Sequence, residues 1–264
     1  MSLKTIHNVL TLKKVFIVVL LCMVLAFSTT IIFSQISSTK TITYFSFVIG
    51  QLFMLIPLAY VIISNNIPII ESIRFKKVPL KIIYYSILLG LGIIIILDEI
   101  DILLQSFIPT PEYITKMDGF MSPDTPLSFL LIILAVVIIA PIGEEVLFRG
   151  FLQQYLEICY KDITKAVITT SIIFTIIHFN PFWMLQIYLM GAALGFLTWR
   201  TGSIIPSIFI HMLNNGLAIF SRFNKWDHQD FYSFYGHLSP VVIIISFILI
   251  FISFKAINSY NKMP

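Results

Sequence analysis

Side chains that could do chemistry gather in one part of an otherwise apolar chain. They are Glu144, Glu145 and Arg149 in one apolar segment, His178 in the next, and His211, Asn214 and Asn215 in a third. A charged side chain at the centre of a bilayer costs about 2.5–3.5 kcal/mol on insertion scales, so such groups usually face the interior of a helix bundle and mark a functional site. Residues 144–215 therefore contain the candidate site.

Helical spacing gives the two adjacent glutamates different roles. Glu145 and Arg149 are four residues apart with the acid first, which is the favourable order for an ion pair within a helix. Glu144 lies about 100° around the same helix, so the two carboxylates cannot act at one point. We expect Arg149 to neutralise Glu145 and to leave Glu144 as the free carboxylate.

Two histidines lie on the two following apolar segments. His211 and Asn215 project from one helix face, and Phe174 and His178 repeat that spacing before the Asn180–Pro181 step, which breaks the helix. Two histidines and a carboxylate on three neighbouring helices could hold a metal with an open position, or a water beside a base. Spacing alone leaves both chemistries open.

The composition fixes the kind of chain that must position these residues. Hydrophobic residues make up 58% of the 264 residues and charged residues 11%, against roughly 25% charged in soluble proteins. Runs of about 20 apolar residues are long enough to cross a bilayer as helices. The sequence predicts an all-α, polytopic membrane protein with about eight spans: 15–33, 43–63, 79–97, 127–158, 164–180, 181–199, 204–220 and 240–254.

Other classes of protein are excluded or disfavoured by composition. The only cysteines are Cys22 and Cys159, so a disulfide scaffold is excluded. We find no internal repeat and no soluble domain, and we interpret residues 1–264 as one membrane domain. The basic residues are spread between spans, which is typical of cytoplasmic loops and not of a nucleic-acid partner.

The distribution of charge predicts which side each loop faces. With the N-terminus in the cytoplasm, 13 of the 17 basic residues fall inside and only Lys40, Lys116, Arg222 and Lys225 fall outside. Because cytoplasmic loops carry excess Lys and Arg, both termini are expected in the cytoplasm. The acidic connector 98–126 is then external, and its stretch 102–108 is either an interfacial helix or a solvated loop.

Three short motifs, each on its own predicted helix, resemble those of a known family. Residues 144–149 have the pattern EExxxR, residues 174–178 the pattern FxxxH, and residues 211–215 the pattern HxxxN. In this order, and in a chain of many spans, the motifs resemble the CPBP family of intramembrane proteases, which comprises type II CAAX prenyl endopeptidases and bacterial Abi proteins. The resemblance covers residues 127–220, which would form the catalytic core.

The resemblance implies hydrolysis of a peptide bond inside the membrane. Glu144 would activate the attacking water, with His178 orienting it, and His211 and Asn215 would stabilise the oxyanion. Glu145, Arg149 and Phe174 would support these groups. The family is described both as metal-dependent and as metal-free, which implies either Zn²⁺ held by Glu144, His178 and His211 or no cofactor, and no HExxH helix is present to require a metal.

Two other functions stay open at this point. A transporter also carries charges at mid-membrane but usually shows internal repeats. A non-catalytic immunity protein against bacteriocins, or another peptide-binding membrane protein, could use the same groove, although the intact set of polar residues argues against it.

The expected partners are membrane lipids and a peptide or membrane-protein substrate. The Ile-, Phe-, Asn- and Lys-rich composition indicates a bacterial cell membrane, where prenylated substrates would be absent.

Overall fold

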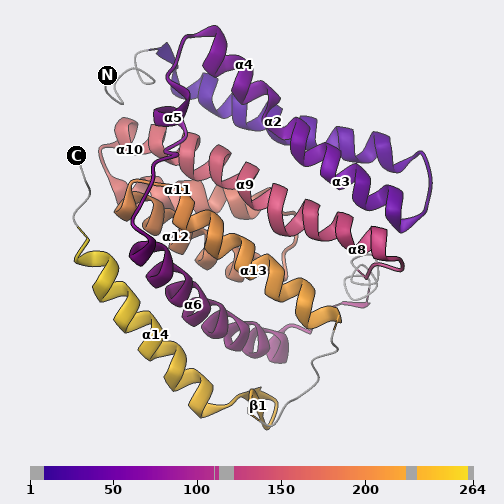
Figure 1. Ribbon diagram of the computed structural model, residues 1–264, viewed down its shortest axis with the longest axis vertical. Coiled ribbons are helices and arrows are strands. Elements are labelled where there is room, and N and C mark those ends of the chain that lie inside the picture. Colours follow the sequence, from indigo (N-terminus) through magenta and orange to yellow (C-terminus); the bar gives the residue numbers. More distant parts are fainter. Residues whose placement is uncertain (1–8, 110, 113–121, 224–230, 261–264) are drawn as a thin grey trace.

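The described residues form an assembly of helices with one short hairpin (Figure 1). The computed structural model describes residues 9–109, 111–112, 122–223 and 231–260. The elements are α2 (Leu12–Ser34), α3 (Lys40–Met54), α4 (Ile56–Ser64), α5 (Ile69–Ser72), α6 (Leu80–Phe107), α8 (Pro126–Ile132), η2 (Ile133–Ile139), α9 (Ala140–Glu144), η3 (Glu145–Gln153), α10 (Gln154–Tyr160), α11 (Ile163–Ile176), α12 (Met184–Thr201), α13 (Ile205–Phe223), β1 (Ser233–Phe234), β2 (His237–Leu238) and α14 (Pro240–Asn258).

Each of the eight predicted segments contains a helix, so the all-α membrane fold is confirmed. Among the described residues, four helical segments are long and apolar enough to cross a membrane, Leu12–Ser34, Lys40–Ser64, Pro126–Tyr160 and Pro240–Asn258, and two shorter helices are apolar. Large apolar side chains such as Ile32 and Phe251 are exposed on the outer faces, as lipid contact requires. The number of spans stays a prediction.

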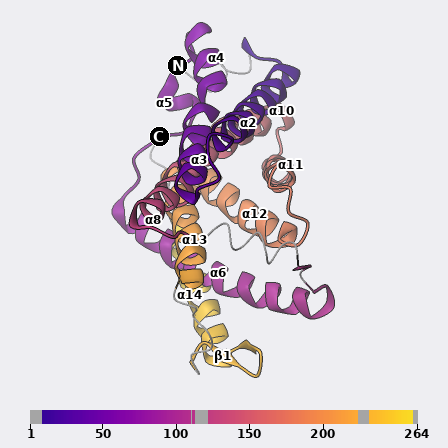
Figure 2. The same ribbon diagram turned by 90° about the vertical axis from the view of Figure 1, so that its right-hand side faces the viewer.

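The helix that carries Glu144 runs through the middle of the assembly. Residues 126–160 form it as α8, η2, α9, η3 and α10 in succession, with α2–α4 on one side and α11–α13 on the other (Figures 1 and 2). The α6–α14 pair lies beyond α13 at the opposite edge. The three helices with the predicted site residues are therefore neighbours.

The third predicted span is longer than expected. The sequence indicated that it ended at residue 97 and that 98–126 was a connector, but α6 continues to Phe107. The acids that suggested an end are satisfied by the hairpin: Asp98 accepts from the Tyr232 hydroxyl at 2.7 Å, and Glu99 accepts from the Leu238 amide at 2.8 Å. Residues 102–107 are thus the last turns of α6 and not a separate interfacial helix, and residues 113–121 lie outside the described chain.

The helix before Pro181 ends earlier than predicted. α11 stops at Ile176, and Ile177 and His178 form a turn. Phe179 follows with φ of 49°, a left-handed conformation that is rare for a bulky residue. His178 therefore lies just beyond the helix and not on its face, one residue before a sharp change in chain direction.

Contacts between loops show which segments share one end of the assembly. The Lys40 ammonium donates to the carbonyl of Ser122 at 2.5 Å, and both residues are predicted outside. Arg74, predicted inside, pairs with Glu157 at the opposite end of the central helix. Cys22 and Cys159 are both free thiols.

Labelling should show which end faces the cytoplasm. Single cysteines at Ser122 and Lys76, in a background without Cys22 and Cys159, are treated with a membrane-impermeant maleimide in intact cells. The Ser122 position should react before the cells are opened, and the Lys76 position only afterwards, because the charge distribution places Lys76 inside. Reaction at Lys76 in sealed cells would contradict the predicted topology.

Candidate active site

The helix that carries Glu144 is widened by two π-helical stretches, η2 and η3, on either side of α9. In η2, the amide of Ala140 bonds to the carbonyl of Ala135, five residues back, and Pro141 has no N–H to offer Val136. The Asn215 amide nitrogen donates to the Val136 carbonyl at 2.9 Å instead. This bond fixes α13 beside the helix that carries Glu144, and such π segments frequently occur at functional sites.

Glu145 and Arg149 form the predicted ion pair in the protein interior. Arg149 Nη1 donates to Glu145 Oε1 at 2.8 Å, and neither side chain is exposed. Arg149 Nη2 also donates to the carbonyl of Gly191 on α12 at 3.2 Å. A buried ion pair is tolerated only where further hydrogen bonds satisfy it, and here the α12 backbone supplies one of them.

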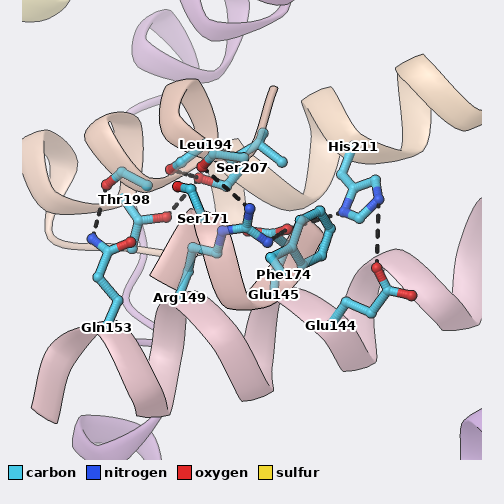
Figure 3. A network of polar contacts seen from close by, with 12 residues as sticks. Glu144, Glu145, Arg149, Gln153, Ser171, Phe174, Leu194, Thr198, Ser207 and His211 are labelled. Carbon is cyan, nitrogen blue, oxygen red and sulfur yellow. Dashed lines mark hydrogen bonds and ion pairs between the residues drawn. The ribbon is translucent and has the colours of Figure 1, made fainter. Parts of the chain in front are cut away.

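His211 lies between the two glutamates (Figure 3). Its Nδ1 is 3.0 Å from Glu145 Oε1, and its Nε2 is 3.7 Å from Glu144 Oε2. Glu144 is the only one of the three whose side chain retains appreciable exposure, at 14%, against 6% for His211 and none for Glu145. The free carboxylate predicted from spacing is therefore also the accessible one.

Phe174 holds the polar groups together. Its ring lies 4.1 Å from the Arg149 guanidinium carbon, in a cation–π contact. The ring also contacts His178 edge-on, with centroids 4.6 Å apart, and His211 at 5.9 Å. The sequence predicted Phe174 only as a supporting residue. In the structure its ring links His178, in the turn that follows α11, to His211 and Arg149.

His178 is exposed and is fixed at one nitrogen. Its Nδ1 lies 2.6 Å from the carbonyl of Phe174. Because a carbonyl only accepts, Nδ1 carries the hydrogen, which leaves Nε2 as the nitrogen that can accept when the ring is neutral. The predicted site residues are thus brought into one region, with His178 joined to the others through Phe174.

The predicted zinc ligands do not form a metal-ligand group. Among the described residues, no three His, Cys, Asp or Glu side chains converge as a metal site requires. Glu144, His178 and His211 are not such a group in the described chain, and the zinc site stays a prediction.

One row of buried polar side chains was not predicted. The spacing of Glu145 and Arg149 continues to Gln153, whose side-chain amide donates at 2.9 Å both to the Gly195 carbonyl and to Glu157. Gly191 and Gly195 on α12 accept from Arg149 and Gln153 respectively. The four-residue spacing is visible in the sequence both for Arg149 and Gln153 and for Gly191 and Gly195. Because Gln and Gly are uncharged, the search for charged groups in apolar segments did not find them.

Adding a methyl group at Gly195 should destabilise the packing of α12. A Cβ there would lie 2.7 Å from Gln153 Oε1 and 3.1 Å from Val167 Cγ1, which is overpacking that typically costs about 1–3 kcal/mol. Gly195→Ala should therefore lower the thermal unfolding temperature of the detergent-purified protein. Gly216→Ala is the matched control, because its Cβ would meet only Val137 at 3.5 Å; equal effects would show that the close packing of α12 is not responsible.

Comparison with known proteins adds independent information. Residues 126–217 match the family described as type II CAAX prenyl endopeptidase Rce1-like. The UPF0177 protein YajF of Lactococcus lactis subsp. lactis (strain IL1403) is 29% identical over 157 residues, which is 58% of this chain and 75% of that protein. No solved structure matches the chain. The matched segment contains all of the candidate site residues.

Proposed function

Because the segment with the candidate site matches the Rce1-like endopeptidase family, we propose that this membrane protein is an intramembrane endopeptidase in which Glu144 activates water. The observation that carries the proposal is the partly exposed Glu144 carboxylate, 3.7 Å from His211 Nε2 at the edge of a fully buried ion pair. A carboxylate in this position can take a proton from water while its neighbour Glu145 stays occupied by Arg149.

The reaction that we propose needs only groups of this chain and water. A water between Glu144 and Nε2 of His211 or His178 loses a proton to Glu144, and its oxygen attacks the carbonyl carbon of the substrate. The carbonyl oxygen becomes an oxyanion. Glu144 then returns the proton to the leaving amine as the C–N bond breaks, which balances the hydrolysis.

Asn215 is the proposed donor to the oxyanion. One N–H of its amide is held by the Val136 carbonyl, and its oxygen accepts from Asn214 at 3.2 Å, so the amide group has a fixed orientation. Its second N–H is the donor that we assign to the oxyanion. A single well-placed donor of this kind is worth about 2.7–4 kcal/mol.

Cleavage of membrane-embedded peptides tests this function. The full chain, reconstituted in liposomes, is given internally quenched peptides that carry an apolar anchoring segment without a prenyl group. Wild-type protein should cleave a subset of these peptides, and Glu144→Gln should cleave none. Binding without any cleavage would instead favour the peptide-binding, immunity-type function.

Removal of metal should leave the activity intact. The geometry does not gather Glu144, His178 and His211 as zinc ligands, so we expect turnover to persist after treatment with 1,10-phenanthroline. Elemental analysis of the purified protein should find far less than one zinc per chain. Turnover that is lost on chelation and restored by added Zn²⁺ would contradict this proposal and support the metal-dependent alternative.

A further inference from the structure

Glu145 contacts more than the arginine that the sequence pairs with it. Its Oε1 lies 2.8 Å from Arg149 Nη1 and 3.0 Å from His211 Nδ1. The first contact stays within one helix, whereas the second joins η3 to α13. One oxygen of a completely buried carboxylate therefore serves both an arginine and a histidine (Figure 3).

The Glu145 carboxylate is held in place by Arg149, whose own position is fixed by two other helices. The Arg149 guanidinium lies over the Phe174 ring at 4.1 Å and donates to the Gly191 carbonyl at 3.2 Å. Gly191 permits this approach, since a Cβ at that residue would be 3.3 Å from Arg149 Nη2. The position of Glu145 is thus set by α11 and α12 as well as by its own helix.

This arrangement determines which nitrogen of His211 carries hydrogen. Glu145 faces a buried guanidinium, which is always charged, so it is a carboxylate and can only accept hydrogen bonds. Nδ1 of His211 must therefore donate. The other nitrogen, Nε2, is the one that faces Glu144.

We propose that Glu145 is a positioning residue of the hydrolysis, which fixes hydrogen on His211 Nδ1 and so reserves Nε2 for the water beside Glu144. The proposal rests on the proposed function of Glu144 as the base. Carboxylates orient histidines in this way in Ser-His-Asp hydrolases, where an orienting group that imposes the wrong tautomer costs about 10⁴ in kcat.

The test removes the acceptor without leaving a buried charge. In the double variant Glu145→Leu/Arg149→Met, kcat for the quenched peptides should fall by about 10²–10⁴ while KM stays within about twofold, as expected for loss of a transition-state interaction. Glu145→Gln differs from an amide in that precedent, because Arg149 Nη1 can only donate and so turns the amide oxygen toward the contact that it shares with His211. Folded Glu145→Gln protein should therefore retain kcat within about tenfold. The matched control is Arg74→Met/Glu157→Leu, which removes the Arg–Glu pair between the segment before α6 and the far end of the central helix and should leave kcat unchanged.

A spectroscopic readout separates positioning from folding. In full-length protein with ¹⁵N-labelled histidine, the His211 signals are identified by their loss in His211→Gln. The wild-type signal should show a protonated Nδ1, as should Glu145→Gln, whereas the double variant should shift toward hydrogen on Nε2.

Two results would overturn the inference: an unprotonated Nδ1 in wild-type His211, or a double variant that retains kcat within about tenfold. The spectrum requires no turnover. It therefore tests the role of Glu145 even if the chain proves not to cleave peptides, which is the separate failure that the cleavage assay with wild-type protein detects.

Discussion

Glu144→Gln should abolish peptide hydrolysis while protein yield and thermal stability stay close to those of the wild type. The substitution keeps the volume of the side chain and removes only its basicity. General-base catalysis typically contributes about 10²–10⁴ in rate, so turnover should fall by at least that factor. Folding should be spared because Glu144 is partly exposed and its contact with His211, at 3.7 Å, is too long for a hydrogen bond.

The matched control for this variant is Glu157→Gln on the same central helix. It makes the same chemical change at the end of the helix where Glu157 pairs with Arg74, and turnover should be retained. The measurement is the initial rate on quenched peptides, with protein amount normalised by size-exclusion chromatography in detergent. If purified Glu144→Gln still turned over substrate, another group would have to be the base.

Arg149→Ala should have its largest effect on the amount of folded protein. The side chain is fully buried and makes the hydrogen bonds to Glu145 and Gly191 and the cation–π contact with Phe174. Truncation leaves the Glu145 carboxylate buried without its counter-charge, and breaking a buried pair in this way costs about 3–5 kcal/mol. The yield of monodisperse protein and the unfolding temperature should both drop.

The double variant Glu145→Leu/Arg149→Met separates charge from volume. Replacing both members of a buried ion pair with apolar residues of similar size is often neutral or stabilising. Its yield should therefore recover to near that of the wild type although its activity does not. If Arg149→Ala were instead fully folded and inactive, Arg149 would act on the substrate and not on the structure.

The sequence predicted the elements better than their ends. Apolar runs located the long helices, although not the short α5. Charge was taken to end the third span at residue 97, whereas Asp98 and Glu99 are bonded by residues of the hairpin segment and the helix continues to Phe107. Likewise Pro181 indicated a break, but the turn begins at Ile177. At Asp98 and Glu99 hydrogen bonds from a distant segment decide the boundary, and no local pattern contains them.

In the candidate site, too, local patterns could be predicted from the sequence and contacts between helices could not. The Glu145–Arg149 pair and the availability of Glu144 follow from helical periodicity, which is local. The contact of His211 with Glu145 depends on how α13 lies against η3, and the Asn215–Val136 bond depends on a π turn at Pro141. Both are properties of packing between helices, so residue types and spacing could not predict them.

The two glycine carbonyls on α12 also bear on how a substrate can enter. Arg149 and Gln153, one turn apart, each donate to the α12 backbone, at Gly191 and Gly195. If α12 slid or rotated against η3, both bonds would break together inside a medium with no water to replace them. Shear between these two helices would therefore be costly, and we expect them to move together. Any displacement that admits a peptide to Glu144 falls to the helices outside this pair.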